Sequence, residues 1–274
     1  MLSTQHRIVN GGFDVAPEVC YPEFKANFTY GPTTNLDKHA NATKVDAWVN
    51  TTFGAERSPT GKVLPLFLNL PGLCERSDSW SRFNYDQCEM TRLLVDKLLG
   101  SGLGITAGDI VIITPYMANV ELMEGMLASN DPGAHPTRQD VRVNTADSFK
   151  GCEANIVIFV LTVNCETGPQ FVADPHRICV GLSRHRDLLF VVGDMQTCSK
   201  QAAWMSAAAE GDGGQVLTSS LGKGGEFKRM LEWFTAKKRV VAVSPSLKVE
   251  ELPGSRGISI FNRVWGSGRR RGGG

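Results

Sequence analysis

Several features that would assign this sequence to a familiar class of protein are missing. It has no apolar run long enough to cross a membrane and no apolar leader segment at its start. Its seven cysteines include no C-x-x-C pair, so their spacing indicates neither a zinc site nor a disulfide framework. The net charge is only +1, so nucleic-acid binding would depend on a local basic patch. These absences favour an intracellular protein, in the cytoplasm or nucleus, with no resident metal.

The standard nucleotide-binding signatures are missing as well. A phosphate-binding loop needs G-x-x-x-x-G-K-[ST], and neither Gly61-Lys62 nor Gly222-Lys223 has the upstream glycine or the following Ser or Thr. The glycines at 100, 102 and 104 follow a helical pattern and precede a strand pattern, the reverse of a dinucleotide-binding site, so they predict a helix end. No Asp-Glu dipeptide occurs, so the paired acids that hold magnesium in many nucleotide hydrolases are absent.

What the sequence does contain is an alternation of short apolar runs with amphipathic segments. This alternation predicts an α/β fold with a mainly parallel sheet and helices on both faces. Pro65 would confine the first strand to an edge or a bulge. Residues 1–60 are expected to be turn-rich, because Gly and Pro interrupt every periodic run. The expected strands are 62–70, 109–114, 141–145, 156–161 and 188–192, and the expected helices are 84–99, 120–127 and 175–184.

The composition changes after about residue 205 and predicts three parts. Residues 1–205 form the α/β domain, and residues 206–225 form a glycine-rich linker. Residues 226–274 contain one short amphipathic helix and a basic Gly/Arg tail that is expected to be disordered.

Two polar clusters stand beside buried strands and are the candidate site. The first covers residues 147–153 and the second residues 183–187. Charged and small residues at the end of a buried strand occupy the position where open α/β sheets bind ligands. The alternative is that both clusters are solvated loops, with Asp147 as a turn cap and with Arg177 and Arg186 as surface charges.

Four motifs in a fixed order resemble a known family. They are Leu2–Arg7 (LSTQHR), Ile112–Tyr116 (IITPY), Asn144–Glu153 (NTADSFKGCE) and Val180–Arg184 (VGLSR). Together they resemble the second, C-terminal RecA-like domain of superfamily 1 helicases of the nonsense-mediated-decay and senataxin type. The resemblance covers about residues 1–205. It implies a RecA-like domain whose sequence begins where a first RecA-like domain would already have ended.

The resemblance implies a nucleotide site. Arg184 would be the catalytic arginine finger, because a planar and permanently charged fork can hold oxygens that gain charge during phosphoryl transfer. Glu153 would organise the γ-phosphate environment, and Gly151 would let the backbone approach a phosphate. The other nucleotide-binding positions would be Gln5, His6 and Arg7, with Arg7 on phosphates and His6 stacked on the base.

The resemblance also implies a nucleic-acid face. Thr114, Tyr116, Ser148 and Lys150 would lie toward the strand, although Tyr116 could instead be a core aromatic residue. Three positions depart from the family pattern: His6 replaces a tyrosine, while Asn119 and Lys150 each replace a glutamine.

The implied function is the C-terminal motor domain of an ATP-dependent DNA or RNA helicase or translocase. ATP with Mg²⁺ would be shared with a first RecA-like domain, normally in the same polypeptide, and the other partner would be a nucleic-acid single strand. Because this sequence lacks the phosphate-gripping lysine and the magnesium-binding acids, it is expected to be inactive alone. The alternative is a catalytically inactive, helicase-derived module that binds nucleic acid or protein.

Overall fold

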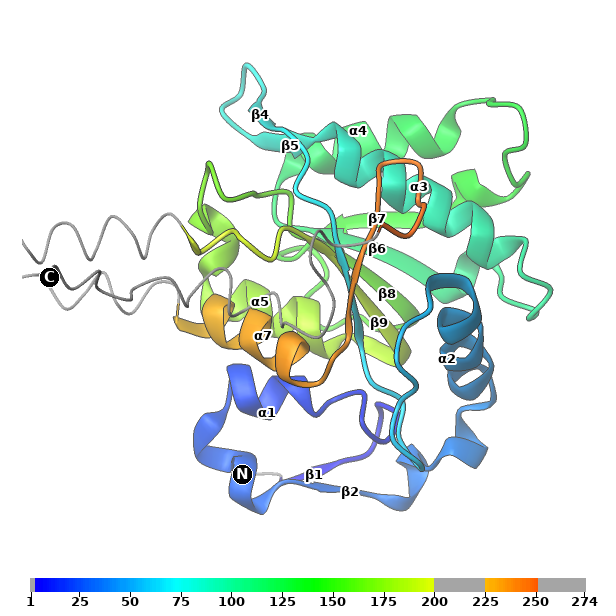
Figure 1. The fold of residues 1–274 in the computed structure, drawn as a ribbon, viewed down its shortest axis with the longest axis vertical. Helices are drawn as coiled ribbons and strands as arrows, with labels where there is room; N and C mark the ends of the chain where they lie inside the picture. The colour runs from blue at the N-terminus through cyan, green and yellow to red at the C-terminus, as the bar shows by residue number, and fades with distance from the viewer. Residues whose placement is uncertain (1–2, 200–224, 251–274) are drawn as a thin grey trace, which may run out of the picture.

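The centre of the molecule is a six-stranded sheet in which every strand is parallel to its neighbours. The computed structural model describes residues 3–199 and 225–250. The strands lie in the order β10-β3-β9-β8-β6-β7 (Figure 1). Their bounds are β3 Leu66–Asn69, β6 Ile110–Thr114, β7 Arg142–Thr145, β8 Ala154–Val160, β9 His185–Gly193 and β10 Val240–Ala242. The predicted α/β class with a mainly parallel sheet is confirmed.

The helices and two short sheets surround this centre. The α-helices are α1 Val15–Val19, α2 Ala40–Phe53, α3 Tyr85–Leu99, α4 Met117–Ala128, α5 Pro175–Ser183 and α7 Gly225–Ala236. Single 3₁₀ turns occupy Pro22–Asn27, Pro32–Thr34, Leu36–Lys38, Ala107–Asp109, Arg138–Asp140 and Gln170–Ala173. β1 Thr4–Gln5 pairs with β2 Thr29–Tyr30, and β4 Cys74–Arg76 forms an antiparallel hairpin with β5 Arg82–Asn84.

The alternation of side chains along the central strands creates two apolar cores. In β8, Ile156 and Ile158 belong to one core, together with the buried sides of α2, α3 and α4. Val157 and Phe159 belong to the other core, together with α1, α5 and α7. Since both faces are covered, the central strands read as continuous apolar runs, as parallel sheets require. Figure 1 shows these two groups of helices on opposite sides of the sheet.

The predicted helix bounds are explained by their end residues. Asn84 caps α3 by accepting a hydrogen bond from the Gln87 backbone N–H at 3.1 Å, and Gly100 follows the last residue. The side chain of Asp174 accepts from the backbone N–H groups at the start of α5, and Pro175 occupies the first turn. The predicted loop at 131–136 contains no helix or strand.

Two expectations for the first part of the chain were wrong. Residues 1–60 contain the fourteen-residue helix α2, although they were expected to be turn-rich. Its buried residues Ala42, Val45, Val49 and Phe53 have helical spacing, and packing against the sheet outweighs the weak helix propensity of the intervening Asn and Thr.

The expectation that Pro65 places its strand at a sheet edge was also wrong. β3 lies between β10 and β9. It begins at Leu66, so the proline precedes the ladder and removes no ladder donor.

The segment after the glycine-rich stretch belongs to the same packed body. Phe227 and Phe234 of α7 are fully buried in the core that α1 and α5 share. β10 extends the main sheet, and Arg239 just before it donates to the carbonyls of Leu64 and Pro65. The predicted linker at 206–225 and the Gly/Arg tail lie almost wholly outside the described residues.

None of the helices in the described part of the chain has both the length and the apolar character that a bilayer crossing needs.

Candidate nucleotide and nucleic-acid sites

The sequence-predicted site residues lie at two opposite ends of the sheet. Gly151 and Glu153 precede β8, and Arg184 precedes β9. The Arg184 carbonyl accepts a hydrogen bond from Ala154 at 3.1 Å, so the two clusters meet at the amino ends of neighbouring strands. Thr114 instead ends β6 at the carboxyl end. The two clusters therefore share one end of the sheet, and it is the end opposite to the one that the general rule for open sheets predicts.

An arginine cluster surrounds Glu153 at the amino end. The Arg7 Nη1 atom lies 3.4 Å from Glu153 Oε2, and the Arg186 Nη1 atom donates to Glu153 Oε1 at 3.3 Å. A second Arg7 nitrogen, Nη2, donates to the Ser183 carbonyl at 2.5 Å. Arg184 has no ion pair with any described residue, and its Nε is buried without a hydrogen-bond partner. Two guanidinium groups, those of Arg7 and Arg186, thus pair with one carboxylate, and the charge of Arg184 acts on Arg7 nearby.

The electrostatics of this cluster suit an anion. Burial lowers the pKa of Arg7 from its ordinary value, and the nearby charge of Arg184 lowers it further, while Glu153 opposes both effects. The Nε of Arg7 is also buried without a partner. A polyphosphate placed here would accept from the arginine side chains and relieve the repulsion among them. The residues present therefore fit the phosphates of a nucleotide.

Two buried side chains fix the start of β9, directly after Arg184. His185 and Asp187 point into the protein, where Asp187 Oδ1 lies 2.7 Å from Nδ1 of the buried His39. Burial lowers the pKa of His185 to about 3, and its Nε2 lies 3.1 Å from the Gly12 carbonyl oxygen. These buried contacts fix the start of the strand, and Arg186 between them is exposed to solvent.

The other predicted nucleotide positions lie near this cluster in sequence or space. The Gln5 Oε1 accepts from the backbone N–H groups of His6 and Arg7, which fixes the turn that places Arg7. His6 is exposed, and its ring lies against Gly31, where an added Cβ would stand 2.4 Å from Nδ1. Gly151 has a φ of +85° and open space where a side chain would begin, so its backbone conformation is what requires glycine.

At the carboxyl end, Thr114 is a buried structural residue. Its hydroxyl lies 3.0 Å from that of Thr162 and accepts from the Asn119 amide at 3.2 Å. Asn119 in turn accepts from the Asn84 backbone N–H at 3.0 Å. Thr114 is fully buried, and its contact with a nucleic-acid strand stays a prediction. The network instead connects β6 and α4 to the β4–β5 hairpin.

Ser148 and Lys150 are exposed and help to hold the connection between β7 and β8. The backbone N–H of Ser148 donates to the Thr145 hydroxyl at 3.1 Å, and Lys150 lies 3.1 Å from Asp147. Arg177 also pairs with Asp147, at 2.9 Å, so it was wrong to treat this arginine as a plain surface charge. Although burial opposes it, the hydrogen bonds from Lys150 and Arg177 lower the pKa of Asp147.

A groove of about 500 Å³ lies beside these residues at the carboxyl end. Its lining includes Tyr116, Met117, Phe171 and the hairpin residues Arg76, Trp80 and Arg82. Tyr116 is mostly buried, and its ring centre is 5.7 Å from that of Phe171. The core interpretation of Tyr116 is therefore confirmed, while its place toward a nucleic-acid strand stays a prediction.

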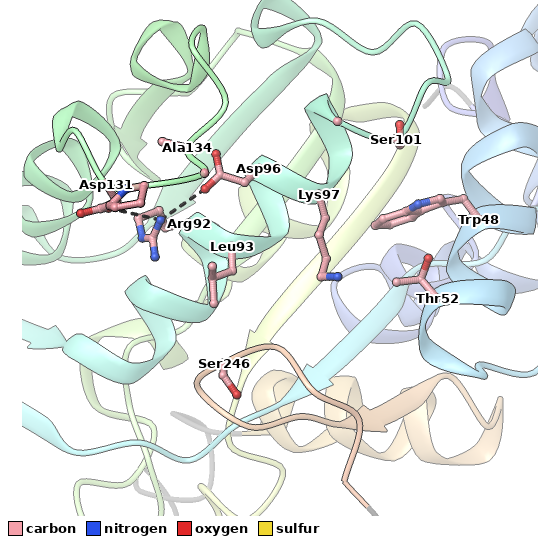
Figure 2. Close-up of a pocket in the computed structure, with 13 residues that line it drawn as sticks. Trp48, Thr52, Arg92, Leu93, Asp96, Lys97, Ser101, Asp131, Ala134 and Ser246 are labelled. Atoms are coloured by element: carbon pink, nitrogen blue, oxygen red, sulfur yellow. Dashed lines mark hydrogen bonds and ion pairs between the residues drawn. The ribbon is translucent and has the colours of Figure 1, made fainter.

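A second hollow, of about 510 Å³, lies away from both ends of the sheet (Figure 2). Trp48 of α2 and Lys97 of α3 line it, and Arg92 pairs there with Asp96 and Asp131. It contains none of the sequence-predicted site residues.

Sequence reasoning missed two kinds of site residue. Arg186 was taken as a surface charge, although it pairs with Glu153. Trp80 and Arg76 lie in a segment that was not assigned to any element, and no motif marks them. Among the described residues, no group of three or more His, Cys, Asp or Glu is placed to hold a metal ion.

Comparison with known proteins places this geometry in a family. The model of an AAA domain family matches residues 1–196. The 5'-3' DNA helicase ZGRF1 of Mus musculus is 30% identical over 158 residues, which cover 57% of this chain and 8% of that protein. The NFX1-type zinc finger-containing protein 1 homolog of Caenorhabditis elegans is 30% identical over 200 residues, 70% of this chain and 7% of that protein.

Regulator of nonsense transcripts 1 of Dictyostelium discoideum is 30% identical over 150 residues, 54% of this chain and 11% of that protein. The chain therefore spans about a tenth of the length of these curated relatives. The predicted resemblance is confirmed: the chain belongs to the AAA domain family that forms the C-terminal RecA-like part of superfamily 1 helicases of the nonsense-mediated-decay and senataxin type.

Proposed function

We propose that this chain acts as the second motor domain of an ATP-dependent helicase or translocase. The observation that carries the proposal is the arginine cluster at the amino ends of β8 and β9, in which Arg184 forms no ion pair with a described residue. Arg184 is assigned as the arginine finger, and Arg7 as a second phosphate contact. Family membership supports both assignments, because the cluster falls within residues that the family model matches.

Glu153 has a different role in this proposal from that of a direct phosphate ligand. It bridges Arg7 and Arg186, so it holds their side chains in place while Arg184 stays free. A carboxylate beside phosphates would repel them, and the two arginines screen that repulsion. We assign Glu153 as the residue that positions the cluster, and Gln5 as the residue that positions Arg7.

ATP supplies the transferable phosphoryl group, and Mg²⁺ neutralises charge on its phosphates. The sequence offers no phosphate-gripping lysine of the P-loop type, so we assign that lysine and the Mg²⁺ ligands to a first RecA-like domain. An intracellular location belongs to the same proposal, supported by a cysteine spacing that indicates no disulfide framework.

The test is reconstitution of the motor. The chain is mixed with the first RecA-like domain of a relative, and ATP hydrolysis is measured with and without a single-stranded oligonucleotide. The mixture should hydrolyse ATP faster than either component, with further stimulation by the single strand. If the mixture bound ATP but hydrolysed it no faster than the first domain alone, the inactive binding module would be the better hypothesis.

A further inference from the structure

Two cysteines from distant parts of the chain meet where α1 packs against α5. Cys20 directly follows the last residue of α1, and Cys179 lies at the middle of α5. Their side chains are in hydrogen-bond contact, and each residue is only partly buried. Figure 1 shows α1, α5 and α7 grouped on one side of the sheet. The two sulfur atoms therefore face each other at a helix junction that keeps contact with solvent.

Hydrogen-bond donors surround the Cys179 sulfur. The Tyr21 hydroxyl oxygen lies 2.8 Å from Sγ of Cys179. The side chains of Cys20 and Ser183 bond to the same sulfur, and Arg184 adds a positive charge nearby. These groups favour the thiolate, because donors and cations interact more strongly with the charged form than with the thiol. With the hydrogen bond from Cys20 as the largest cause, they lower the pKa of Cys179 to about 6, although burial opposes them.

Cys20 has the opposite character. Its hydrogen bond with Cys179 is the largest cause that raises the pKa of Cys20, and burial raises it further. Two charged groups of α7 face it, Glu226 and Arg229, which act in opposite directions and pair with each other at 2.7 Å. Arg229 also donates to the Val19 carbonyl at 3.0 Å, which fixes the end of α1. Cys20 therefore stays a protonated thiol beside the Cys179 thiolate.

Three other cysteines show the contrast. Burial raises the pKa of each of them above its ordinary value, so they carry little thiolate near neutral pH: Cys74, Cys88 and Cys198. Oxidants react with the thiolate, and redox-active cysteines are often placed next to a second cysteine that can close a disulfide. The Cys179–Cys20 pair has both properties.

We propose that Cys179 and Cys20 form a reversible oxidation site for hydroperoxides, in which Cys179 attacks the peroxide and Cys20 then closes a disulfide with it. The inference does not rest on the proposed motor function. It assigns to the α1–α5 junction a chemistry that can be measured without nucleotide or nucleic acid.

The reaction has two steps. In the first, the Cys179 thiolate attacks one peroxide oxygen: an S–O bond forms, the O–O bond breaks, and the leaving oxygen takes a proton from solvent to give an alcohol or water. Cys179 loses two electrons and becomes a sulfenic acid, while the peroxide gains two. In the second, the Cys20 sulfur attacks the Cys179 sulfur: the S–S bond forms, the S–OH bond breaks, and the hydroxide leaves as water with the Cys20 proton. A dithiol reductant restores both thiols by exchange.

The site adjoins the arginine cluster. Ser183, which bonds to the Cys179 sulfur, offers its carbonyl to Arg7, and Arg184 follows it in the chain. Oxidation would replace the thiolate near Arg184 by an uncharged disulfide. The same step would join α1 to α5 by a covalent bond.

The test treats the reduced full chain with hydrogen peroxide at pH 6, blocks the remaining thiols and maps the cysteines by mass spectrometry. At pH 6 about half of Cys179 is thiolate, against about 0.3% of a thiol with the ordinary pKa of about 8.5. The low pKa makes this thiolate roughly tenfold less nucleophilic, which leaves it a net advantage of roughly 10-fold in rate. Cys179 should exceed the half-buried Cys74 by at least this factor, and the product should be a Cys20–Cys179 disulfide that dithiothreitol removes.

Three variants separate the two steps. Cys20→Ser keeps a hydrogen-bond donor beside Cys179 and should stop the reaction at the sulfenic acid, which dimedone traps. Cys179→Ser should abolish both the sulfenic acid and the disulfide. Tyr21→Phe keeps the ring but loses the hydroxyl, and it should slow the oxidation of Cys179 at pH 6 by roughly 2- to 6-fold, because a hydrogen bond to the charged form is lost. Tyr85→Phe, at an exposed tyrosine beside a different hollow, is the matched control and should change nothing.

Equal oxidation rates for Cys179 and Cys74 in the parent chain would overturn the inference. Oxidation of Cys179 to a sulfinic acid without any Cys20–Cys179 disulfide would also overturn it, as would a disulfide that formed only between two copies of the chain. Each of these results would leave the motor proposal standing, because reconstituted ATP hydrolysis measures the arginine cluster separately.

Discussion

Arg239 joins the segment after residue 225 to the first half of the chain, and Arg239→Met should show how much stability this junction contributes. Its side chain is 1% exposed. It donates to Asp46 at 3.0 Å, to the carbonyls of Leu64 at 2.9 Å and Pro65 at 3.2 Å, and to the carbonyl of Glu56. Methionine preserves much of the volume but leaves one carboxylate and three carbonyls without these donors.

Removing one partner of a buried ion pair typically costs about 3–5 kcal/mol, because the other charge stays buried and unpaired. Burial also lowers the pKa of Arg239, which indicates that its charge is held away from water. In urea unfolding with a slope of about 3 kcal/mol per molar, the midpoint should fall by roughly 1–1.7 M. The matched control is Lys238→Met: this neighbour is exposed and only weakly paired, so the change should cost less than about 0.5 kcal/mol.

A loss below about 1 kcal/mol for Arg239→Met, equal to that of the control, would refute this reasoning. It would mean that α7 and β10 are docked without contributing to the unfolding transition, as the sequence-based division at residue 205 implied.

Two further predictions concern the face that α5 covers. A hydrogen bond from Cys20 is the main cause that lowers the pKa of Cys179, to about 6. The alkylation of Cys179 by iodoacetamide, measured by mass spectrometry, should therefore rise through pH 6 and level off by pH 7. Half-maximal labelling of Cys179 above pH 8 would contradict the assigned hydrogen bond. Gly181→Ala should lower the free energy of unfolding by about 1–3 kcal/mol, because the added Cβ would stand 2.3 Å from the Phe159 ring. The control Gly125→Ala adds a Cβ in open space on a helix and should be neutral or slightly stabilising. Equal unfolding midpoints for the two variants would contradict the packing of α5 on the sheet.

The parallel strands could be predicted from the sequence because burial on both faces leaves a simple pattern. Val157 and Phe159 face one core while Ile156 and Ile158 face the other, so the run has no polar position and reads as a strand. Helix α2 could not be predicted in the same way. Its buried residues are separated by Asn, Thr and Lys, and its formation depends on the sheet that it covers.

The site residues that belong to a recognisable motif could be predicted from the sequence, and the others could not. Arg7, Glu153 and Arg184 come from distant parts of the chain, and the motifs alone suggested that they meet. The tertiary pairing of Arg186 with Glu153 has no local sequence signal beyond its spacing from Arg184. Thr114 shows that a motif does not by itself identify a ligand contact. This motif residue is buried, and its hydroxyl lies beside that of Thr162.

The most direct test of the account is the turnover of the reconstituted motor with Arg184→Lys, compared with Arg57→Lys at an exposed position. Lysine keeps the charge but loses the bidentate fork, so turnover should fall by about 10³–10⁵, equivalent to roughly 4–7 kcal/mol of transition-state stabilisation. The dissociation constant for ATP should change far less, because the contact strengthens as charge develops on the transferred group. Turnover within a few-fold of both the parent and Arg57→Lys would contradict the assignment of Arg184 as the arginine finger.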